Sequence, residues 1–346
     1  MTTENREGLI ETAVRRMPKA EMHFHFEGAF RWSTVRELHP DGRALPEIPP
    51  WHGKPFENWE AFTAVFSQFL KPVTGKPEWI ERHALEALED LALQNVRYVE
   101  LLVSHRFHAW RGLSEREVWE AVVRGRARAQ AKHRIDAPLF LGVSRDQPPE
   151  AAEAIFEQIA EFAVPAGWLK GIDLQSDERA RPNRDFARLY AKAAQLGLKL
   201  RAHAGEHGGA ENVRDAVDLC GALHISHGTR AAEEPALVAY LARTGAWLHL
   251  CPSSNWLLGV CPSIAANPLR KLQDAGVRCT VNSDDPLLFA TDTTREYLIA
   301  TTEMGFSRSE IAGLAKNAFG ASLLADRDIA EACAEIDRCL STRKSP

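Results

Sequence analysis

The strongest constraint on the fold is a repeating order along the chain, in which a short β-rich run is followed by a stretch with helical character. Strands that alternate with single helices pair in parallel, and eight such units close into a barrel. We therefore predict an α/β fold, a (β/α)8 TIM barrel, formed as a single domain over residues 1–346. The eight predicted strands lie in residues 20–28, 96–104, 138–144, 169–176, 199–206, 222–228, 246–255 and 277–286.

Two intervals are longer than one connecting helix requires. Residues 29–95 predict a helical insertion after the first strand, over one mouth of the barrel, and residues 293–342 predict extra C-terminal helices. Elsewhere single helices fit the spacing. Residues 210–221 carry apolar side chains at helical intervals, and residues 233–245 have a proline near their start and a glycine at their end.

The composition argues against several classes of partner. A formal net charge of −5 gives no general attraction to nucleic acid or to an anionic membrane surface. No apolar stretch approaches the roughly 20 residues that span a bilayer, and residues 1–21 lack the apolar segment of a signal peptide. The six cysteines form no C-x-x-C pair, so we expect free thiols and a cytoplasmic protein.

The first predicted strand contains an unusual pair of histidines in the sequence AEMHFHFEGAF. Side chains two residues apart on a strand point the same way, so His23, His25 and Glu27 share one face. A half-buried strand with a polar outer side would explain this pattern. A metal site would explain it equally well, because two imidazoles in register run into Gly28, where another group can approach the backbone.

Ionisable residues recur where the predicted strands end. In such barrels the chemistry lies at the carboxyl ends of the strands. Four of these ends carry polar groups here: His23 and His25 with Glu27, then His203 with Glu206, then His227, and finally Asp284 with Asp285. Three histidines and an aspartate suit zinc, with iron and manganese as alternatives, and a metal-bound water has a pKa of about 7. With an acid and a base nearby, this set predicts metal-assisted hydrolysis.

The same stretches resemble the adenosine deaminase family. MPKAEMHFHFEGAF is similar to the opening strand of that family, HAGEHGGAENVRDAVD to its fifth-strand signature, and HISHG to its sixth strand. CPSSNWLLG and NSDDPLLF resemble its last two strands, so the resemblance covers residues 18–289, with residues 317–324 similar to its terminal helix. The zinc deaminases that act on cytosine carry a P-C-x-x-C motif instead, which is missing from this sequence.

The resemblance implies a site and a reaction. One zinc ion per chain would be held by His23, His25, His203 and Asp284, and the 6-amino group of a small purine would leave as ammonia. In the family pattern His227 orients and deprotonates the attacking water, Glu206 transfers a proton at purine N1, and Asp285 contacts the water or N7. The remaining substrate contacts implied by the resemblance fall on Glu27, Gly28 and the backbone near Ser176.

The substrate is less well defined than the chemistry. We expect adenosine or a related adenine nucleoside, because DDPLLF resembles the nucleoside branch of the family. Glu27 stands where adenosine-specific members usually carry aspartate, and His-x-His-x-Glu-Gly is similar to the branch that takes free adenine. Adenine deaminase and aminodeoxyfutalosine deaminase are therefore the alternatives. A non-catalytic purine-binding protein is a more remote one, because it would have lost a ligand or Glu206.

Three further readings can be compared with a structure. A two-metal amidohydrolase would need a bridging carboxylate or a modified lysine at the end of the fourth strand, whereas Lys170 lies at its start. His105 and His108 follow the second strand, and we expect exposed loop positions for both, although either could touch a substrate. We expect ordinary core packing for the apolar positions at helical spacing in the insertion, although the family pattern places that helix beside the purine pocket. These positions are Phe62, Val65, Phe66, Phe69 and Leu70.

Overall fold

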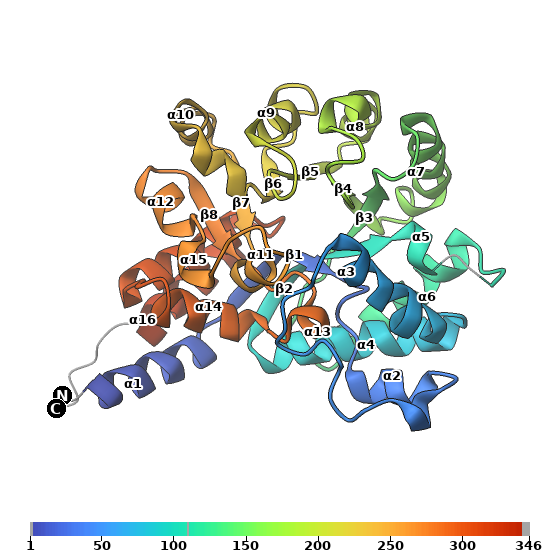
Figure 1. The fold of residues 1–346 in the computed structure, drawn as a ribbon, viewed down its shortest axis with the longest axis horizontal. Helices are drawn as coiled ribbons and strands as arrows, with labels where there is room; N and C mark the ends of the chain where they lie inside the picture. Colours follow the sequence, from blue (N-terminus) through green and yellow to red (C-terminus); the bar gives the residue numbers. More distant parts are fainter. Residues whose placement is uncertain (1–2, 109–110, 341–346) are drawn as a thin grey trace.

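Eight parallel strands form the centre of the molecule and follow one another around a single sheet in the order β1 to β8 (Figure 1). The structure is a computed structural model that describes residues 3–108 and 111–340. All eight strands lie on the predicted runs, with β1 beginning one residue earlier, so the predicted TIM barrel is confirmed. The strands are β1 (Lys19–His25), β2 (Val96–Ser104), β3 (Leu139–Ser144), β4 (Leu169–Gln175), β5 (Lys199–Ala204), β6 (His224–His227), β7 (Trp247–Leu250) and β8 (Arg278–Val281).

The long interval after β1 is helical, as predicted. It contains α2 (Trp32–Leu38), α3 (Trp59–Val65), a π-helical turn at Phe66–Leu70, and α4 (Pro77–Leu93). The helix α4 packs against β2 and against α6 (Glu115–Gln130). It is therefore the barrel's own first helix. The segment that is extra to the barrel is therefore the part before α4.

The remaining helices surround the barrel and extend it at the C-terminal end (Figure 1). The predicted helices at 210–221 and 233–245 are α9 and α10. Those between strands are α5 (His105–His108), α6 (Glu115–Gln130), α7 (Pro149–Ala163), α8 (Ala187–Gln195), α9 (Ala210–Asp218), α10 (Pro235–Thr244), α11 (Pro252–Leu257) and α12 (Leu269–Asp274). After β8 come α13 (Pro286–Phe289), α14 (Thr293–Thr302), α15 (Arg308–Gly320) and α16 (Asp326–Leu340), and α1 (Thr3–Arg16) packs on α14 and α16.

The barrel interior is held by ion pairs between strands. Alternation along β4 and β5 places apolar side chains toward the helices and charged ones inside. Arg201 on β5 reaches Asp173 on β4 at 2.6 Å and Glu100 on β2 at 3.1 Å, and Lys199 reaches Glu100 at 2.5 Å. Arg201, Asp173 and Glu100 are fully buried, where charges persist only when they are paired. These pairs link β2, β4 and β5 directly beneath the carboxyl ends of the strands.

The barrel closes where its first and last strands meet. Phe24 on β1 forms an isolated parallel bridge with Asp284, which follows β8. The backbone N–H of His25 donates to the carbonyl of Asp284 at 2.9 Å, and the N–H of Asp284 donates to the carbonyl of His23 at 3.2 Å. This seam fixes the backbone of three predicted site residues against one another.

Two predictions from composition can be compared with the described residues. None of the helices there has the length and apolar character needed to cross a bilayer. All six cysteines are free thiols, as expected, and four of them are buried.

Glu296 on α14 is a buried carboxyl group that links this helix to neighbouring turns. It accepts hydrogen bonds from the backbone N–H of Ser253 at 3.2 Å and from the hydroxyl of Thr291 at 2.5 Å. Burial raises the pKa of Glu296 to about 7. The group therefore binds its proton more tightly in the folded chain than in the unfolded chain.

This difference predicts a pH dependence of stability. The free energy of unfolding should fall as pH rises from 4.5, the ordinary value for this group, through about 7. In Glu296→Gln the amide oxygen can accept the Ser253 N–H while the amide nitrogen donates to the Thr291 hydroxyl, so this uncharged side chain should remove about 1–3 kcal/mol of that fall. Urea unfolding at about pH 5 and about pH 8 measures it, with exposed Glu303→Gln as the control. The same pH slope in Glu296→Gln and in the control would contradict the prediction.

Candidate active site

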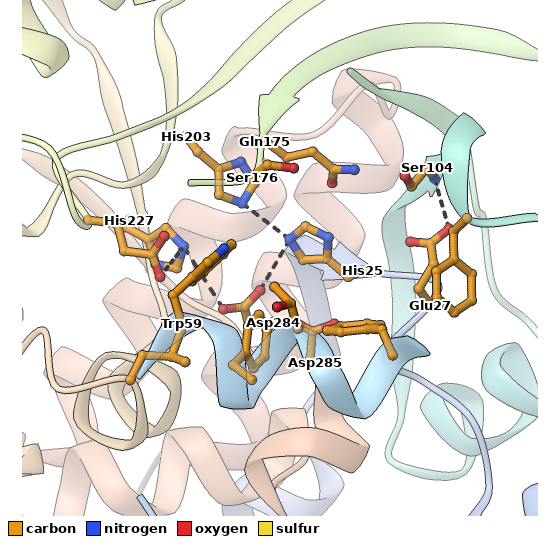
Figure 2. A pocket seen from close by; sticks show the side chains of 16 residues that line it. His25, Glu27, Trp59, Ser104, Gln175, Ser176, His203, His227, Asp284 and Asp285 are labelled. Atoms are coloured by element: carbon orange, nitrogen blue, oxygen red, sulfur yellow. Dashed lines mark hydrogen bonds and ion pairs between the residues drawn. The ribbon is translucent and has the colours of Figure 1, made fainter. Parts of the chain in front are cut away.

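A pocket of about 200 Å³ lies at the carboxyl ends of the strands, where function is expected in this fold (Figure 2). One wall is aromatic and comes from α3, the π-helical turn and α5. The other wall is polar and comes from the strand ends. The aromatic residues are Trp59, Phe62, Phe66 and Phe107, and the polar ones are His25, Glu27, Ser104, Gln175, Ser176, His203, Glu206, His227, Asp284 and Asp285.

The predicted metal ligands converge at the floor of this pocket. The Nε2 atom of His25 lies 3.3 Å from Nε2 of His23 and 3.2 Å from Nε2 of His203. Oδ1 of Asp284 lies 3.1 Å from Nε2 of His23 and 3.3 Å from Nε2 of His25. Ligand atoms in a tetrahedral zinc site, with bonds of about 2.0–2.2 Å, lie about 3.3–3.6 Å apart. His23, His25 and Asp284 lie close enough together to hold a metal ion, and His203 lies beside His25 in the same cluster.

A second layer of hydrogen bonds orients these ligands. Nδ1 of His203 lies 2.9 Å from Oδ1 of Asp173, which leaves Nε2 of the ring free to bind a metal. Asp173 in turn accepts hydrogen bonds from Arg201 at 2.6 Å and from the hydroxyl of Ser226 at 2.9 Å. Partners of this kind fix the tautomer and direction of a metal-binding histidine. The interior ion pairs of the barrel thus extend to the floor of the pocket.

Glu206 lies in a loop that one buried carboxylate holds in place. The carboxylate of Glu178, in the segment after β4, accepts the backbone N–H groups of four consecutive residues, 205–208, at 2.6–2.9 Å. It also accepts a side-chain hydrogen bond from Asn212 at 3.0 Å. The backbone that carries Glu206 is therefore fixed relative to β4 and β5.

The environment of Glu206 favours its protonated form. Its side chain is almost completely buried, with 3% of the residue exposed. Burial, followed by the nearby charges of Asp284 and Glu178, raises the pKa of Glu206 well above its usual range. A carboxyl group that keeps its proton near neutral pH can donate it to a ring nitrogen.

His227 lies at the end of β6, between Glu206 and the proposed metal ligands. Its Nε2 atom is 3.4 Å from Oε1 of Glu206 and 3.9 Å from Oδ2 of Asp284. Burial and the neighbouring imidazole of His23 lower the pKa of His227 well below its usual value, so the ring is neutral. A neutral imidazole at this position can hold a water molecule beside the metal ligands.

Asp285 and Gly28 depend on each other for their positions. A Cβ atom added to Gly28 would lie 1.9 Å from Oδ1 of Asp285, so only glycine allows the aspartate to occupy this place. Oδ1 of Asp285 is buried and has no hydrogen-bond partner among the described residues. Burial and the charge of Asp284 raise the pKa of Asp285 well above its usual range. This carboxyl group is available to a water molecule or to a substrate.

Glu27 forms the far end of the polar wall, and here one prediction is wrong. His108 is fully buried rather than exposed, and its Nε2 lies 2.9 Å from Oε1 of Glu27. The same oxygen accepts the backbone N–H of Ser104 at 2.8 Å (Figure 2). The short helix α5 turns back after β2 and buries the His108 ring. The side chain of His105 lies outside the described part of the chain.

Ser176 and Gln175 form the wall beside β4. The backbone of Ser176 has a φ of 79°, and its hydroxyl lies 3.1 Å from that of Ser144. Gln175 is 7% exposed, and its Oε1 has no partner among the described residues. His227 and Asp284 also have positive φ angles, of 65° and 63°. Strained backbone of this kind gathers at functional sites, and three such positions adjoin this pocket.

The aromatic wall combines core packing with a pocket surface. Phe62 is 6% exposed and stacks on Phe289 of α13 with ring centroids 5.7 Å apart. Phe62 and Phe66 also line the cavity. The expected core packing is therefore confirmed for Phe62, and the same residue also faces the pocket at the strand ends.

Several functional contacts were not anticipated from the sequence. Asp173 and Gln175 alternate in phase on β4, and that spacing of two polar residues within a buried strand was the available signal. Glu178 acts on backbone groups, so no sequence pattern marks its partners. The partner of Glu27, His108, is 81 residues away along the chain.

Comparison with known proteins gives a consistent picture. A family model described as Adenosine deaminase matches residues 18–339. The adenine deaminase of Sphingopyxis alaskensis is 33% identical over 327 residues, which is 93% of this chain and 94% of that protein. The crystal structure of an adenine deaminase from Arthrobacter aurescens superposes with a TM-score of 0.85 at 26% identity, covering 93% of this chain and 98% of that one. An amidohydrolase from Burkholderia ambifaria with bound zinc has a TM-score of 0.85 at 26% identity, covering 98% and 94% of the two chains.

Proposed function

Because this chain belongs to the adenosine deaminase family, we propose that it is a zinc-dependent hydrolase of free adenine. Water adds to C6 of the purine ring, the C6–N bond breaks, and the products are hypoxanthine and ammonia. Relatives named adenine deaminase favour this substrate over the adenosine that we expected from the sequence.

His23, His25, His203 and Asp284 are the residues that would hold the metal. Their nitrogen and oxygen donors, and four distances of 3.1–3.3 Å that link them, support this assignment. When bound, zinc would lower the pKa of a coordinated water to about 7 and so supply a nucleophile near neutral pH. The solved zinc-containing relative from Burkholderia ambifaria supports the choice of metal.

The remaining side chains would move protons and hold the substrate. Glu206, kept protonated by its surroundings, would donate a proton to purine N1 and make C6 more electrophilic. His227 would orient the attacking water, and Asp285 would contact that water or N7 of the purine. One proton of the water would leave with the amino group as ammonia, and the proton of the new C6 hydroxyl would return to Glu206 as the C6 carbonyl forms.

The orientation of the Glu27 carboxyl group is the observation that supports free adenine as the substrate. Oε1 of Glu27 is occupied by Ser104 and His108, while its second oxygen turns toward the pocket (Figure 2). A carboxyl oxygen that faces a pocket can accept a hydrogen bond from a bound molecule. Free adenine carries an N–H on its imidazole ring, whereas in a nucleoside that nitrogen bears the sugar. Glu27 therefore supplies an acceptor that suits the base and that the nucleoside would leave unpaired.

Ammonia release measured across a set of purines tests the proposal. We expect kcat/KM for adenine to exceed the values for adenosine, deoxyadenosine and a 5′-extended adenine nucleoside by at least ~10²-fold, because an unpaired buried polar group is strongly discriminating. Glu27→Asp shortens the side chain and should lower the adenine value without restoring adenosine. If the wild-type protein prefers adenosine, or if Glu27→Asp gains activity on adenosine, the proposal of free adenine is wrong and a nucleoside is the substrate.

A further inference from the structure

A series of hydrogen bonds connects His227 to the backbone of Leu269 through two asparagine side chains. Which group donates in each bond follows from the bond at Leu269. It begins at the backbone N–H of Leu269, which donates to Oδ1 of Asn267 at 3.1 Å. A backbone N–H can only donate, so the oxygen of the Asn267 amide is fixed on that side. The nitrogen of Asn267 then faces Oδ1 of Asn255 at 2.9 Å and donates to it.

The same direction continues to the imidazole ring. With Oδ1 of Asn255 occupied by Asn267 and by the hydroxyl of Thr229 at 3.3 Å, its Nδ2 faces Nδ1 of His227 at 3.1 Å. An amide nitrogen only donates, so Nδ1 of His227 must accept and carries no proton. Asn255 is fully buried and Asn267 is 5% exposed, so water does not compete for these groups.

We propose that Asn255 and Asn267 are positioning residues that fix the proton of His227 on Nε2. This proposal rests on the function proposed above, because it defines how His227 meets the attacking water. Nε2 is the atom that faces Glu206 and Asp284, so His227 presents a hydrogen-bond donor at that point. In this tautomer His227 holds the oxygen of the water and cannot also accept a proton from it.

The substitution Asn267→Asp should reverse the donor and acceptor order of these hydrogen bonds without changing His227 itself. The aspartate still accepts the N–H of Leu269 but can no longer donate to Asn255. The Asn255 amide would turn, donate to the new carboxylate, and offer its oxygen to Nδ1 of His227. The proton of His227 would then move from Nε2 to Nδ1, and the water would lose its donor.

The test combines spectroscopy with kinetics on the zinc-loaded protein. Nitrogen-15 NMR of labelled histidines, with His227→Gln to assign the signal, reports which ring nitrogen is protonated. We expect Nε2 in the wild type and Nδ1 in Asn267→Asp, with kcat for adenine lowered at least ~10²-fold and KM changed little. A histidine held in the wrong tautomer costs about 10⁴-fold in the serine-protease triad.

Asn267→Ala is the matched control, because it removes the contact to Asn255 without adding an acceptor that would turn the Asn255 amide, whose oxygen still accepts from Thr229. It should keep the proton on Nε2 and retain most of the kcat, whereas a purely structural role would affect both variants alike. A wild-type His227 protonated on Nδ1, or an Asn267→Asp variant with unchanged tautomer, would overturn the proposal. A wild type that leaves adenine intact would instead overturn the proposed function, since the NMR result does not depend on turnover.

Discussion

Replacing Glu206 with glutamine is expected to lower kcat for adenine by at least ~10²-fold, the lower range for a general acid or base. Glutamine has nearly the same shape, and the backbone contacts of its loop to Glu178 do not involve the side chain that changes. The amide cannot release a proton to purine N1 near neutral pH. The measurement is steady-state ammonia release, with KM expected to change far less than kcat.

Two further measurements separate this effect from a general loss of structure. Zinc content and melting temperature of Glu206→Gln should match the wild type, because Glu206 is not among the proposed ligands. Glu211→Gln is a suitable control, since Glu211 is exposed at the start of α9 and lies five residues away in sequence. A Glu206→Gln enzyme with normal turnover would remove Glu206 from the mechanism.

Loss of one metal ligand should have an effect at least as large. The variant His203→Ala keeps three of the four proposed metal ligands, His23, His25 and Asp284. We expect its activity to fall by more than ~10²-fold, because substitution of a residue that only supports a ligand typically costs 10- to 100-fold. Zinc should be lost at chelator concentrations that leave the wild type loaded. Elemental analysis and chelator competition measure this directly.

The matched control is His52→Ala, which removes an exposed histidine outside the pocket. It should keep both zinc and activity. Chelation of the wild type should abolish turnover, and added Zn²⁺ should restore it, whereas His203→Ala should recover little. A fully active His203→Ala protein, or wild-type protein that works without any transition metal, would contradict the proposed metal site.

The fold could be predicted from the sequence because its information is local and periodic. Each strand is a short buried run, and most strands are followed by an interval of the right length for a helix. The convergence of His25, His203 and Asp284 followed from the same pattern, since the carboxyl ends of parallel strands meet whatever the loops do. Local sequence patterns were therefore sufficient to predict the positions of site residues that lie at the ends of strands.

Contacts made by loops and by backbone groups could not be predicted in this way. His108 was expected to be exposed, and its burial depends on how four residues turn after β2. Glu178 binds backbone N–H groups, which every sequence offers. The proposed preference for adenine depends on the length of the Glu27 side chain and on which of its oxygens faces the pocket. Such details depend on tertiary geometry.

The seam between the first and last strands has a consequence for how the enzyme is made. His23 and His25 leave the ribosome early, whereas Asp284, which the seam holds against them, is synthesised near the end. A growing chain therefore cannot complete the proposed zinc site, and metal acquisition should follow barrel closure. Bound zinc would link β1 to the residues after β8 and stabilise their pairing. Hydrogen exchange at the His25 amide should therefore slow when zinc is added. Equal exchange with and without zinc would show that the strands meet without its help.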